Sequence, residues 1–478
     1  MISPGKLASG EKYDKWLIVI YSMLVFFGIL NIYSSIYSED AASIFSLSTR
    51  AGMQMLWWGV SSVAAIFILY VLNPKIYDVM SFFFYAGIVL LLVVTIFLGT
   101  EVNGSHSWLG IGSFRFQPAE LSKITTSMFL ASIISQYGFK LSSPRWFIRV
   151  ALALAIPMAA IFLEKETGTV VVYAGFIFML YREGLKGWIL GLGIATIILF
   201  VITLKFSTFA GLFLAFILCT ILASYASRTR YFYRGLAITA VCVACLFIPY
   251  GTGFLPESLD FIKEEYVLLA AAILTIGSYF IKPSKWCDKK QLILISAIFL
   301  FMVMTVFSVE FIFENVLQPH QKVRIENLLG ISEDIYNSGY NVHQSKIAIG
   351  SGGLTGKGYL EGTQTKFNFV PEQSTDFIFC TIGEEWGFLG SVAIIVTYLL
   401  LIGRIIFLSE RSDDKYTRVY GYCIASIIFM HFFINIGMTI GLVPVIGIPL
   451  PFISYGGSSL LSFTVMLFIF IKLQAIER

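Results

Sequence analysis

Apolar residues run through this chain in long continuous stretches separated by short polar intervals. Each stretch has about 20 residues, the length of helix that crosses the hydrocarbon core of a membrane. The apolar positions do not alternate with polar ones, so membrane-spanning strands are not indicated. The pattern predicts about fourteen membrane helices, near residues 16–34, 52–72, 80–99, 119–137, 147–163, 168–184, 187–204, 207–226, 231–250, 265–281, 291–314, 384–407, 419–442 and 452–473.

The composition is that of a membrane protein. Of the 478 residues, 57% are hydrophobic and 13% are charged, whereas a soluble domain has about 25% charged residues. The net charge of +4 comes from the loops and does not indicate nucleic-acid binding. The polar N-terminus leads into a full-length span, so no cleavable signal peptide is predicted. The six cysteines lack the spacing of a metal site, and five lie in or beside apolar runs, as small apolar residues do: Cys219, Cys242, Cys245, Cys380 and Cys423.

Lysine and arginine residues predict how the helices are oriented. They concentrate in every second loop, near 140–145, 182–186, 228–234, 282–290 and 404–418. Because positively charged loops stay in the cytoplasm, both termini are predicted to be cytoplasmic. The segments predicted to lie outside are 35–51, 100–118 and the long loop 315–383.

The longest polar interval, residues 339–390, contains the strongest candidates for chemistry. Asp376 begins an apolar run, Glu372 precedes it, and Glu384 follows two turns later. An aspartate at a helix start is often only a cap or a partner of the helix dipole. Several acids near one membrane interface, facing scattered cations, favour a polar site instead.

A glycine-rich stretch, residues 350–358, lies upstream of these acids. It is similar to a phosphate-binding loop but fails the template, because Ser351 and Gly358 replace the required glycine and the hydroxyl residue that binds magnesium. We expect instead a bend that lets two backbones approach closely. Lys346 and, further upstream, Arg324 could bind a diphosphate, although such charges are also common at loop rims.

Two further polar clusters lie at the predicted outer edge of the membrane. In the first, Pro118 suits a helix start, and Glu120 and Lys123 then lie one turn apart on the same face. Ionised groups at membrane depth are costly and usually functional, although this pair could simply lock helix packing. Trp108 before it could be an ordinary interfacial tryptophan. The second cluster, residues 164–169, is either a solvated turn or a supporting element.

The last cluster, residues 435–459, contains three prolines and the pair Gly456–Gly457, which break one helix and open the next. Broken backbone at membrane depth is tolerated only where protein covers it or where it lines a wet cavity. Packing alone would also explain most of these residues.

Taken in order, these pieces resemble one family. NGSHSW with QPAELSK, GYNVHQSKIAIGSGGLTGKG, GTQTKFNFVPEQSTDFIF with IGEEWGFLG, and NIGMTIGLVPVIGIPLPFISYGGSS are similar to motifs of the SEDS membrane glycosyltransferases, and GIPLP to those of the RodA branch. The resemblance implies an all-α polytopic enzyme of the bacterial inner membrane. It implies polymerisation of lipid II, the undecaprenyl-diphosphate disaccharide-pentapeptide, into glycan strands during elongation, together with a class B penicillin-binding protein.

The resemblance also implies which residues act. The family's essential aspartate falls on Asp376, its membrane Glu and Lys on Glu120 and Lys123, and its loop tryptophan on Trp108. We therefore expect Asp376 to be catalytic. Substrate contacts are expected from Glu120, Lys123, Trp108, Arg324, Lys346, Glu372 and Thr375, and supporting roles from Glu166, Gln344, Ser345 and Glu384.

The chain departs from the family pattern in three ways. Ser107 stands where the family usually has arginine, and the family's QPDLGT is EKETGT here, with Glu166 in place of the aspartate. The family has about ten spans, so about four helices are additional. We predict that residues 1–204 and 291–478 form the two halves of the core and that 205–290 are the added helices.

Polymerisation needs a base for the attacking sugar hydroxyl and positive charge on the departing diphosphate. Asp376 is the predicted base, and attack in one step inverts the donor carbon. The sequence leaves open whether a divalent cation assists the lysines and arginines. The alternatives are a lipid II flippase and a scaffold that activates its partner enzyme. A carrier needs a site near the midplane, whereas these charges lie at the outer edge, which favours the enzyme.

Overall fold

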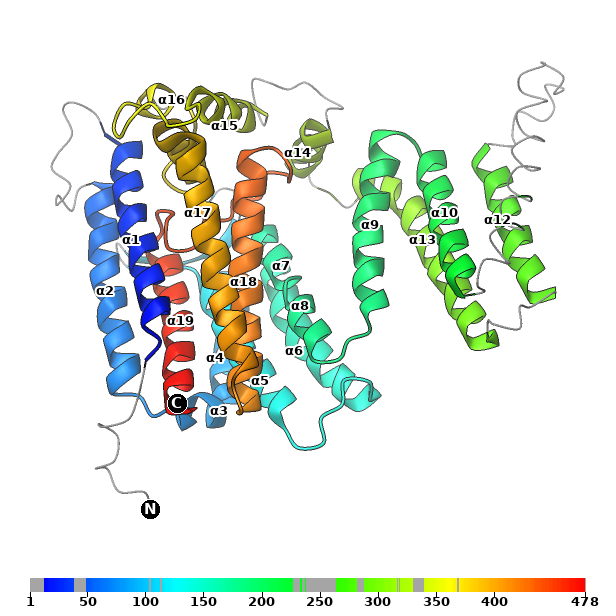
Figure 1. Cartoon of the computed structure of the whole chain (residues 1–478), viewed down its shortest axis with the longest axis horizontal. Coiled ribbons are helices and arrows are strands. Elements are labelled where there is room, and N and C mark those ends of the chain that lie inside the picture. The colour runs from blue at the N-terminus through cyan, green and yellow to red at the C-terminus, as the bar shows by residue number, and fades with distance from the viewer. Residues whose placement is uncertain are drawn as a thin grey trace. The chain divides into compact units, whose positions relative to one another are not determined.

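A computed structural model describes the arrangement of the helices (Figure 1). The residues it describes are 13–37, 49–102, 105–111, 114–226, 264–281, 288–315, 319–329, 339–367 and 369–477, with the single positions 233, 237 and 317. The chain forms two compact units, Met1–Leu185 with Asp334–Arg478, and Lys186–Glu333. The second unit contains the stretch 205–290, and its assignment as added helices stays a prediction.

The first unit brings together helices from both ends of the sequence. Its elements are α1 (Lys15–Ser35), α2 (Arg50–Tyr70), α3 (Lys75–Val79), α4 (Ser81–Leu98), β1 (Thr100–Val102), β2 (Ser105–Ile111), β3 (Phe114–Phe116), α5 (Pro118–Ser135), α6 (Pro144–Leu163), α7 (Thr167–Tyr173), α8 (Phe176–Arg182), α15 (Tyr340–Ser351), α16 (Thr363–Lys366), α17 (Ile378–Glu410), α18 (Lys415–Thr439) and α19 (Gly457–Glu477).

The second unit is a separate helical body with its own apolar core. It consists of α9 (Gly187–Lys205), α10 (Thr208–Ala226), α12 (Glu264–Ile281), α13 (Lys289–Asn315) and α14 (Pro319–Leu329). Leu199, Phe216 and Val306 are among the side chains buried in its core.

The prediction of a polytopic α-helical membrane protein is confirmed. Within the described residues, nine helices are long and apolar enough to cross a membrane. Three shorter apolar helices add to them, Thr167–Arg182, Thr208–Ala223 and Leu268–Phe280. The predicted span 231–250 falls almost wholly outside the described residues, so the count of fourteen stays a prediction.

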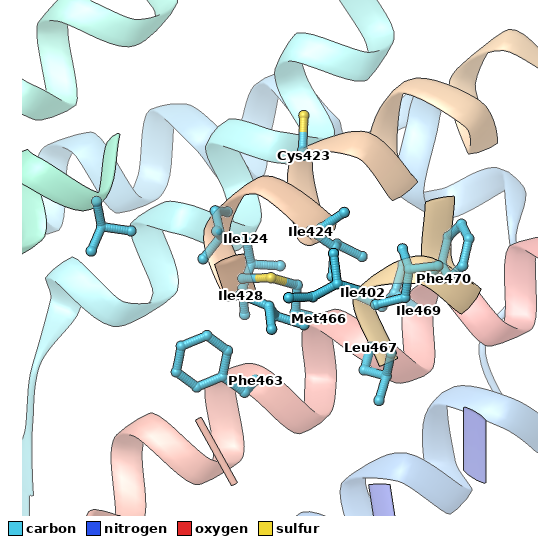
Figure 2. Packing of buried hydrophobic residues seen from close by; sticks show 14 of the residues in the cluster. Ile124, Ile402, Cys423, Ile424, Ile428, Phe463, Met466, Leu467, Ile469 and Phe470 are labelled. Carbon is cyan, nitrogen blue, oxygen red and sulfur yellow. The ribbon is translucent and has the colours of Figure 1, made fainter. Parts of the chain in front are cut away.

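Helices α5, α17, α18 and α19 pack together at the centre of the first unit. Figure 2 shows Ile124 of α5, Ile428 of α18 and Met466 of α19 pointing toward one another. These side chains are at most 4% exposed. The close packing fixes the faces of α5 and α18 that also present polar groups, and so positions the site described below.

A small antiparallel sheet precedes α5, in the stretch predicted to lie outside. The strands follow the order β1-β2-β3, with Val102 opposite Ser105 and Leu109 opposite Phe116. The backbone N–H of His106 donates to the carbonyl of Glu164 over 3.0 Å. The sheet is therefore attached to the turn between α6 and α7. Only helices were predicted, because strands this short leave no periodic signal.

Helix α17 is kinked where the glycine-rich bend packs against it. Gly387 has φ 65° and ψ −159° within the helix, and the N–H groups of Phe388 and Leu389 donate to the carbonyls of Gly353 and Leu354, over 2.9 and 3.1 Å. A Cβ on Gly356, which has φ +83°, would collide with the Glu385 backbone. The expected close approach of two backbones is confirmed, and the bend satisfies donors that the kink releases.

We predict that Gly356→Ala destabilises the protein, because it adds a Cβ to a left-handed residue packed against backbone. The conformation alone costs about 1–2 kcal/mol. The melting temperature of the purified protein in detergent should fall clearly. Gly350→Ala is the matched control, since Gly350 is helical and has open space around its Cβ position. Equal melting temperatures for the two variants would contradict this account.

Candidate active site

A non-helical segment between α18 and α19, residues 440–456, lies beside the polar residues of the candidate site. We call this segment the wall. Gly441 and Gly447 have φ of +75° and +76°, which glycine adopts without strain. Asn435 of α18 donates through Nδ2 to the carbonyl of Ile448 over 2.7 Å. Helix α19 then begins at Gly457, as predicted. Protein groups thus satisfy the broken backbone, as its predicted depth in the membrane demands.

Asp376 lies in the turn before α17 and is half-buried. The N-cap residue of α17 is Phe377, which makes no side-chain cap hydrogen bond. Asn435 Nδ2 also donates to the Asp376 carbonyl over 2.8 Å, and a Cβ on Gly447 would lie 3.3 Å from Asp376 Oδ2. The same amide therefore holds the backbone of Asp376 and the segment beside its carboxylate.

Arg50, the first residue of α2, contacts the turn that precedes Asp376. Its Nη1 donates to Ser374 Oγ over 2.7 Å and lies 3.8 Å from Glu372 Oε2, with both charged side chains about half exposed. Thr375 Oγ1 lies 3.1 Å from Glu372 Oε2. The predicted residues Glu372 and Thr375 are thus brought together with Asp376. Sequence analysis missed Arg50, because an arginine at the edge of a predicted span resembles any flanking charge.

Glu120 and Lys123 form the expected pair, and a histidine extends it. Lys123 Nζ lies 2.9 Å from Glu120 Oε1 and 2.8 Å from His431 Nε2. His431 Nδ1 lies 3.1 Å from the Pro449 carbonyl. The Lys123 side chain is 0% exposed, so protein groups rather than solvent surround this cation. Sequence analysis missed His431, since a lone histidine within an apolar span usually indicates packing.

Two glutamates lie in the turn between α6 and α7, beneath the sheet. Glu166 Oε2 accepts hydrogen bonds from the hydroxyls of Ser105 and Ser107, each over 3.0 Å. Glu164 is 0% exposed, and neither of its carboxylate oxygens has a hydrogen-bond partner among the described residues. Burial, and then the charge of Glu166, raises the pKa of Glu164 to about 8. Burial also raises the pKa of Glu166, against the hydrogen bonds from the two serines.

Three predicted residues of α15 lie near the start of the segment 440–456. Ser345 of α15 donates to the Thr439 carbonyl over 2.9 Å, Gln344 beside it is half-buried, and Lys346 is exposed. A Cβ on Gly441 would collide with the Lys346 side chain, so Lys346 lies against one end of the segment whose other positions contact Asp376.

Glu384 binds the loop that follows the glycine-rich bend, and its supporting role in the site stays a prediction. It is 0% exposed and accepts a hydrogen bond from Lys357 Nζ over 2.6 Å. The backbone N–H groups of Gln364 and Thr365 add bonds of 2.8 and 2.9 Å. Glu384 therefore fastens the loop after the glycine-rich bend onto α17, and its carboxylate is fully occupied by this task.

Two further predicted residues belong to other elements. Arg324 is an exposed residue of α14, which belongs to the second unit, and its contact with substrate stays a prediction. Trp108 of β2 is half-buried, and its carbonyl accepts from Thr100 Oγ1 over 3.0 Å. Among the described residues, no group of three His, Cys, Asp or Glu side chains could hold a metal ion.

Comparisons with known proteins assign the chain to a family. A family model described as "Cell cycle protein", for FtsW, RodA and SpoVE, matches residues 14–217 and 290–478. The chain belongs to the FtsW/RodA/SpoVE family. Residues 218–289 lie outside the match with this family.

Members of the FtsW/RodA/SpoVE family align with nearly the whole chain. A protein of Treponema pallidum named peptidoglycan glycosyltransferase RodA is 30% identical over 459 residues, which cover 94% of each chain. Peptidoglycan glycosyltransferase MrdB of Escherichia coli K12 is 26% identical over 445 residues, covering 93% of this chain and 88% of MrdB.

Solved structures share the fold. Thermus thermophilus RodA matches with a TM-score of 0.55 at 18% identity, covering 99% of both chains. A chain from a structure titled as a peptidoglycan synthase complex that coordinates polymerization and crosslinking matches with a TM-score of 0.60 at 18% identity, covering 97% of this chain and 98% of that one.

Glu164 should make stability depend on pH. The folded protein keeps a proton that the unfolded chain releases between about pH 4.5 and 8, so the free energy of unfolding falls as pH rises through this window. The fall is at most about 1.4 kcal/mol per pH unit.

We predict that Glu164→Gln removes this contribution, because an amide cannot titrate. Thermal unfolding of wild type and variant from pH 5 to 9 tests the prediction. Glu361→Gln, at an exposed glutamate, should leave the pH dependence as it is in wild type. A Glu164→Gln protein with the full wild-type slope would refute the assignment.

Proposed function

We propose that this chain is a peptidoglycan glycosyltransferase that polymerises lipid II in a bacterial cytoplasmic membrane during cell elongation. Its family, and the enzymes named peptidoglycan glycosyltransferase that align along its length, support the activity. The single observation on which the mechanism rests is the position of Asp376 beside the wall. Asp376 is half-buried, its backbone carbonyl accepts a hydrogen bond from Asn435, and a Cβ on Gly447 would lie 3.3 Å from its Oδ2.

In the proposed step, a sugar hydroxyl of the acceptor attacks the anomeric carbon of the donor. Asp376 accepts the hydroxyl proton while the new carbon–oxygen bond forms, and the bond from that carbon to the diphosphate oxygen breaks. The lipid diphosphate leaves with the bonding electron pair, so it needs positive charge more than it needs a proton. Attack from the face opposite the leaving group converts an α-linked donor to a β-linked strand.

Two exposed cations could receive the diphosphate. Arg50 contacts the turn that contains Glu372 and Ser374, and Lys346 lies against Gly441 at the other end of the same wall. The pair of Glu120 with Lys123 is buried. We assign it a supporting role, in which it stabilises the wall through His431.

We place the reaction on the extracytoplasmic side. Asp376 precedes α17 by two residues. Helix α17 begins at the end of the first unit where α15 and α16 lie, whereas the C-terminus is at the opposite end (Figure 1). The positive-inside pattern supports a cytoplasmic C-terminus. A class B penicillin-binding protein is the proposed partner, because a crosslinking enzyme must receive the strands as they form, and the structurally similar synthase complex supports this pairing.

Asp376→Asn should abolish polymerisation, because an amide cannot accept the hydroxyl proton. We expect a loss of at least about 100-fold, within the usual range for removal of a general base. The assay is strand formation from purified lipid II by purified protein, with and without partner. Asp413→Asn, an equal charge change at an exposed residue between α17 and α18, should polymerise normally. A folded Asp376→Asn protein with wild-type activity would refute Asp376 as the base. Polymerisation seen only with the partner, and equal for wild type and variant, would support a scaffold instead.

Lys346→Gln should weaken binding of lipid II through the loss of one charge-assisted contact to the diphosphate. Such a contact is worth about 1.5–3 kcal/mol, so KM should rise by roughly 10–100-fold. The measurement is initial rate against lipid II concentration in detergent micelles. Lys140→Gln, at an exposed residue between α5 and α6, is the control and should keep the wild-type KM. An unchanged KM for Lys346→Gln would remove Lys346 from the site.

A further inference from the structure

His431 belongs to a buried polar cluster with Glu120 and Lys123, and the proposed chemical step gives it no role. It is 2% exposed, and Phe463 of α19 contacts its ring edge-on, with centroids 4.8 Å apart. The same phenylalanine ring lies 4.9 Å from Lys123 Nζ. The Phe463 ring therefore packs against both the histidine and the lysine.

The hydrogen bonds of His431 define which ring nitrogen is protonated. A lysine ammonium can only donate, so Nε2, which lies 2.8 Å from Lys123 Nζ, must accept. A neutral imidazole then has its proton on Nδ1, and that nitrogen donates to the Pro449 carbonyl over 3.1 Å. Lys123 and Pro449 together select one tautomer and one ring orientation.

The Pro449 carbonyl belongs to the wall beside Asp376. His431 and Asn435 lie one turn apart on α18, so they face the same segment. Asn435 holds the adjacent carbonyl of Ile448 and also the carbonyl of Asp376, over 2.7 and 2.8 Å. Two side chains of one helix face therefore fix two consecutive carbonyls of the wall.

We propose that His431 is a positioning residue, oriented by Lys123. It holds the Pro449 carbonyl and thereby fixes the wall beside the Asp376 carboxylate. The proposal rests on the proposed function for its kinetic consequence. It gives the buried pair of Glu120 and Lys123 a purpose that needs no contact with substrate. The pair fixes the orientation of the His431 ring, and His431 fixes the position of the Pro449 carbonyl. The wall that contains Pro449 lies beside the Asp376 carboxylate.

The first test measures which ring nitrogen of His431 is protonated, and it does not depend on enzyme activity. In protein labelled with ¹⁵N-histidine, the imidazole shifts at neutral pH should show one histidine with a protonated Nδ1 and an unprotonated Nε2. The chain has four histidines, and the signal is assigned by its absence from His431→Asn. Lys123→Met should shift this signal. A proton on Nε2, or an imidazolium, would overturn the proposal.

The second test separates the two hydrogen bonds of His431. Asparagine can place an amide N–H near the position of Nδ1, and so can keep the bond to Pro449. Glutamine reaches the position of Nε2 and loses that bond. We expect kcat of His431→Gln to fall by about 10–100-fold, since small displacements of a catalytic group have such effects. KM should stay within about threefold, and His431→Asn should keep a kcat several-fold higher than His431→Gln.

Tyr173→Phe is the matched control, because the Tyr173 hydroxyl makes buried hydrogen bonds to Ser122 and Thr126 of α5 that do not lead to the wall. It should lower the melting temperature with little change in kcat. Equal kcat for His431→Gln and wild type would overturn the positioning role, as would equal losses in His431→Gln and His431→Asn. Failure of the wild-type protein to polymerise lipid II would instead refute the proposed function, and the tautomer would still be measured.

Discussion

Backbone that leaves a helix inside a membrane must find its hydrogen bonds within the protein, because lipid offers none. The segment between α18 and α19 meets this demand through side chains from several helices. Asn435 and His431 bind its carbonyls, and Gln54 of α2 accepts from the N–H of Gly456. A segment held in this way provides a fixed surface beside the carboxylate of Asp376.

Among the described residues, two buried glutamates have lysine partners and a third has a raised pKa. Lys123 pairs with Glu120, and Glu384 accepts from Lys357 and from two backbone N–H groups. Glu164, which has no hydrogen-bond partner among the described residues, instead has its pKa raised by burial. Charges of this kind are expensive away from water, so we attribute their presence to the precision with which they fix loops and turns.

In the proposed mechanism, Asp376 takes a proton and Arg50 and Lys346 face the diphosphate, while the buried ion pairs hold the surrounding backbone. The division suits a reaction in which the leaving group is already good. The enzyme then needs mainly one base in a fixed place and positive charge beside it.

Length and hydropathy alone determined that this chain is a helical membrane protein, and local spacing placed Glu120 and Lys123 on one face, because both properties depend on a few neighbouring residues. The bend at 350–358 was also predictable, since glycine has a local conformational meaning. Only the tertiary structure decided that Arg50 meets Ser374 and that Lys123 meets His431, and that Arg324 belongs to a different unit. Those outcomes depend on which helix faces pack together, and hydrophobic periodicity does not encode the choice of neighbour.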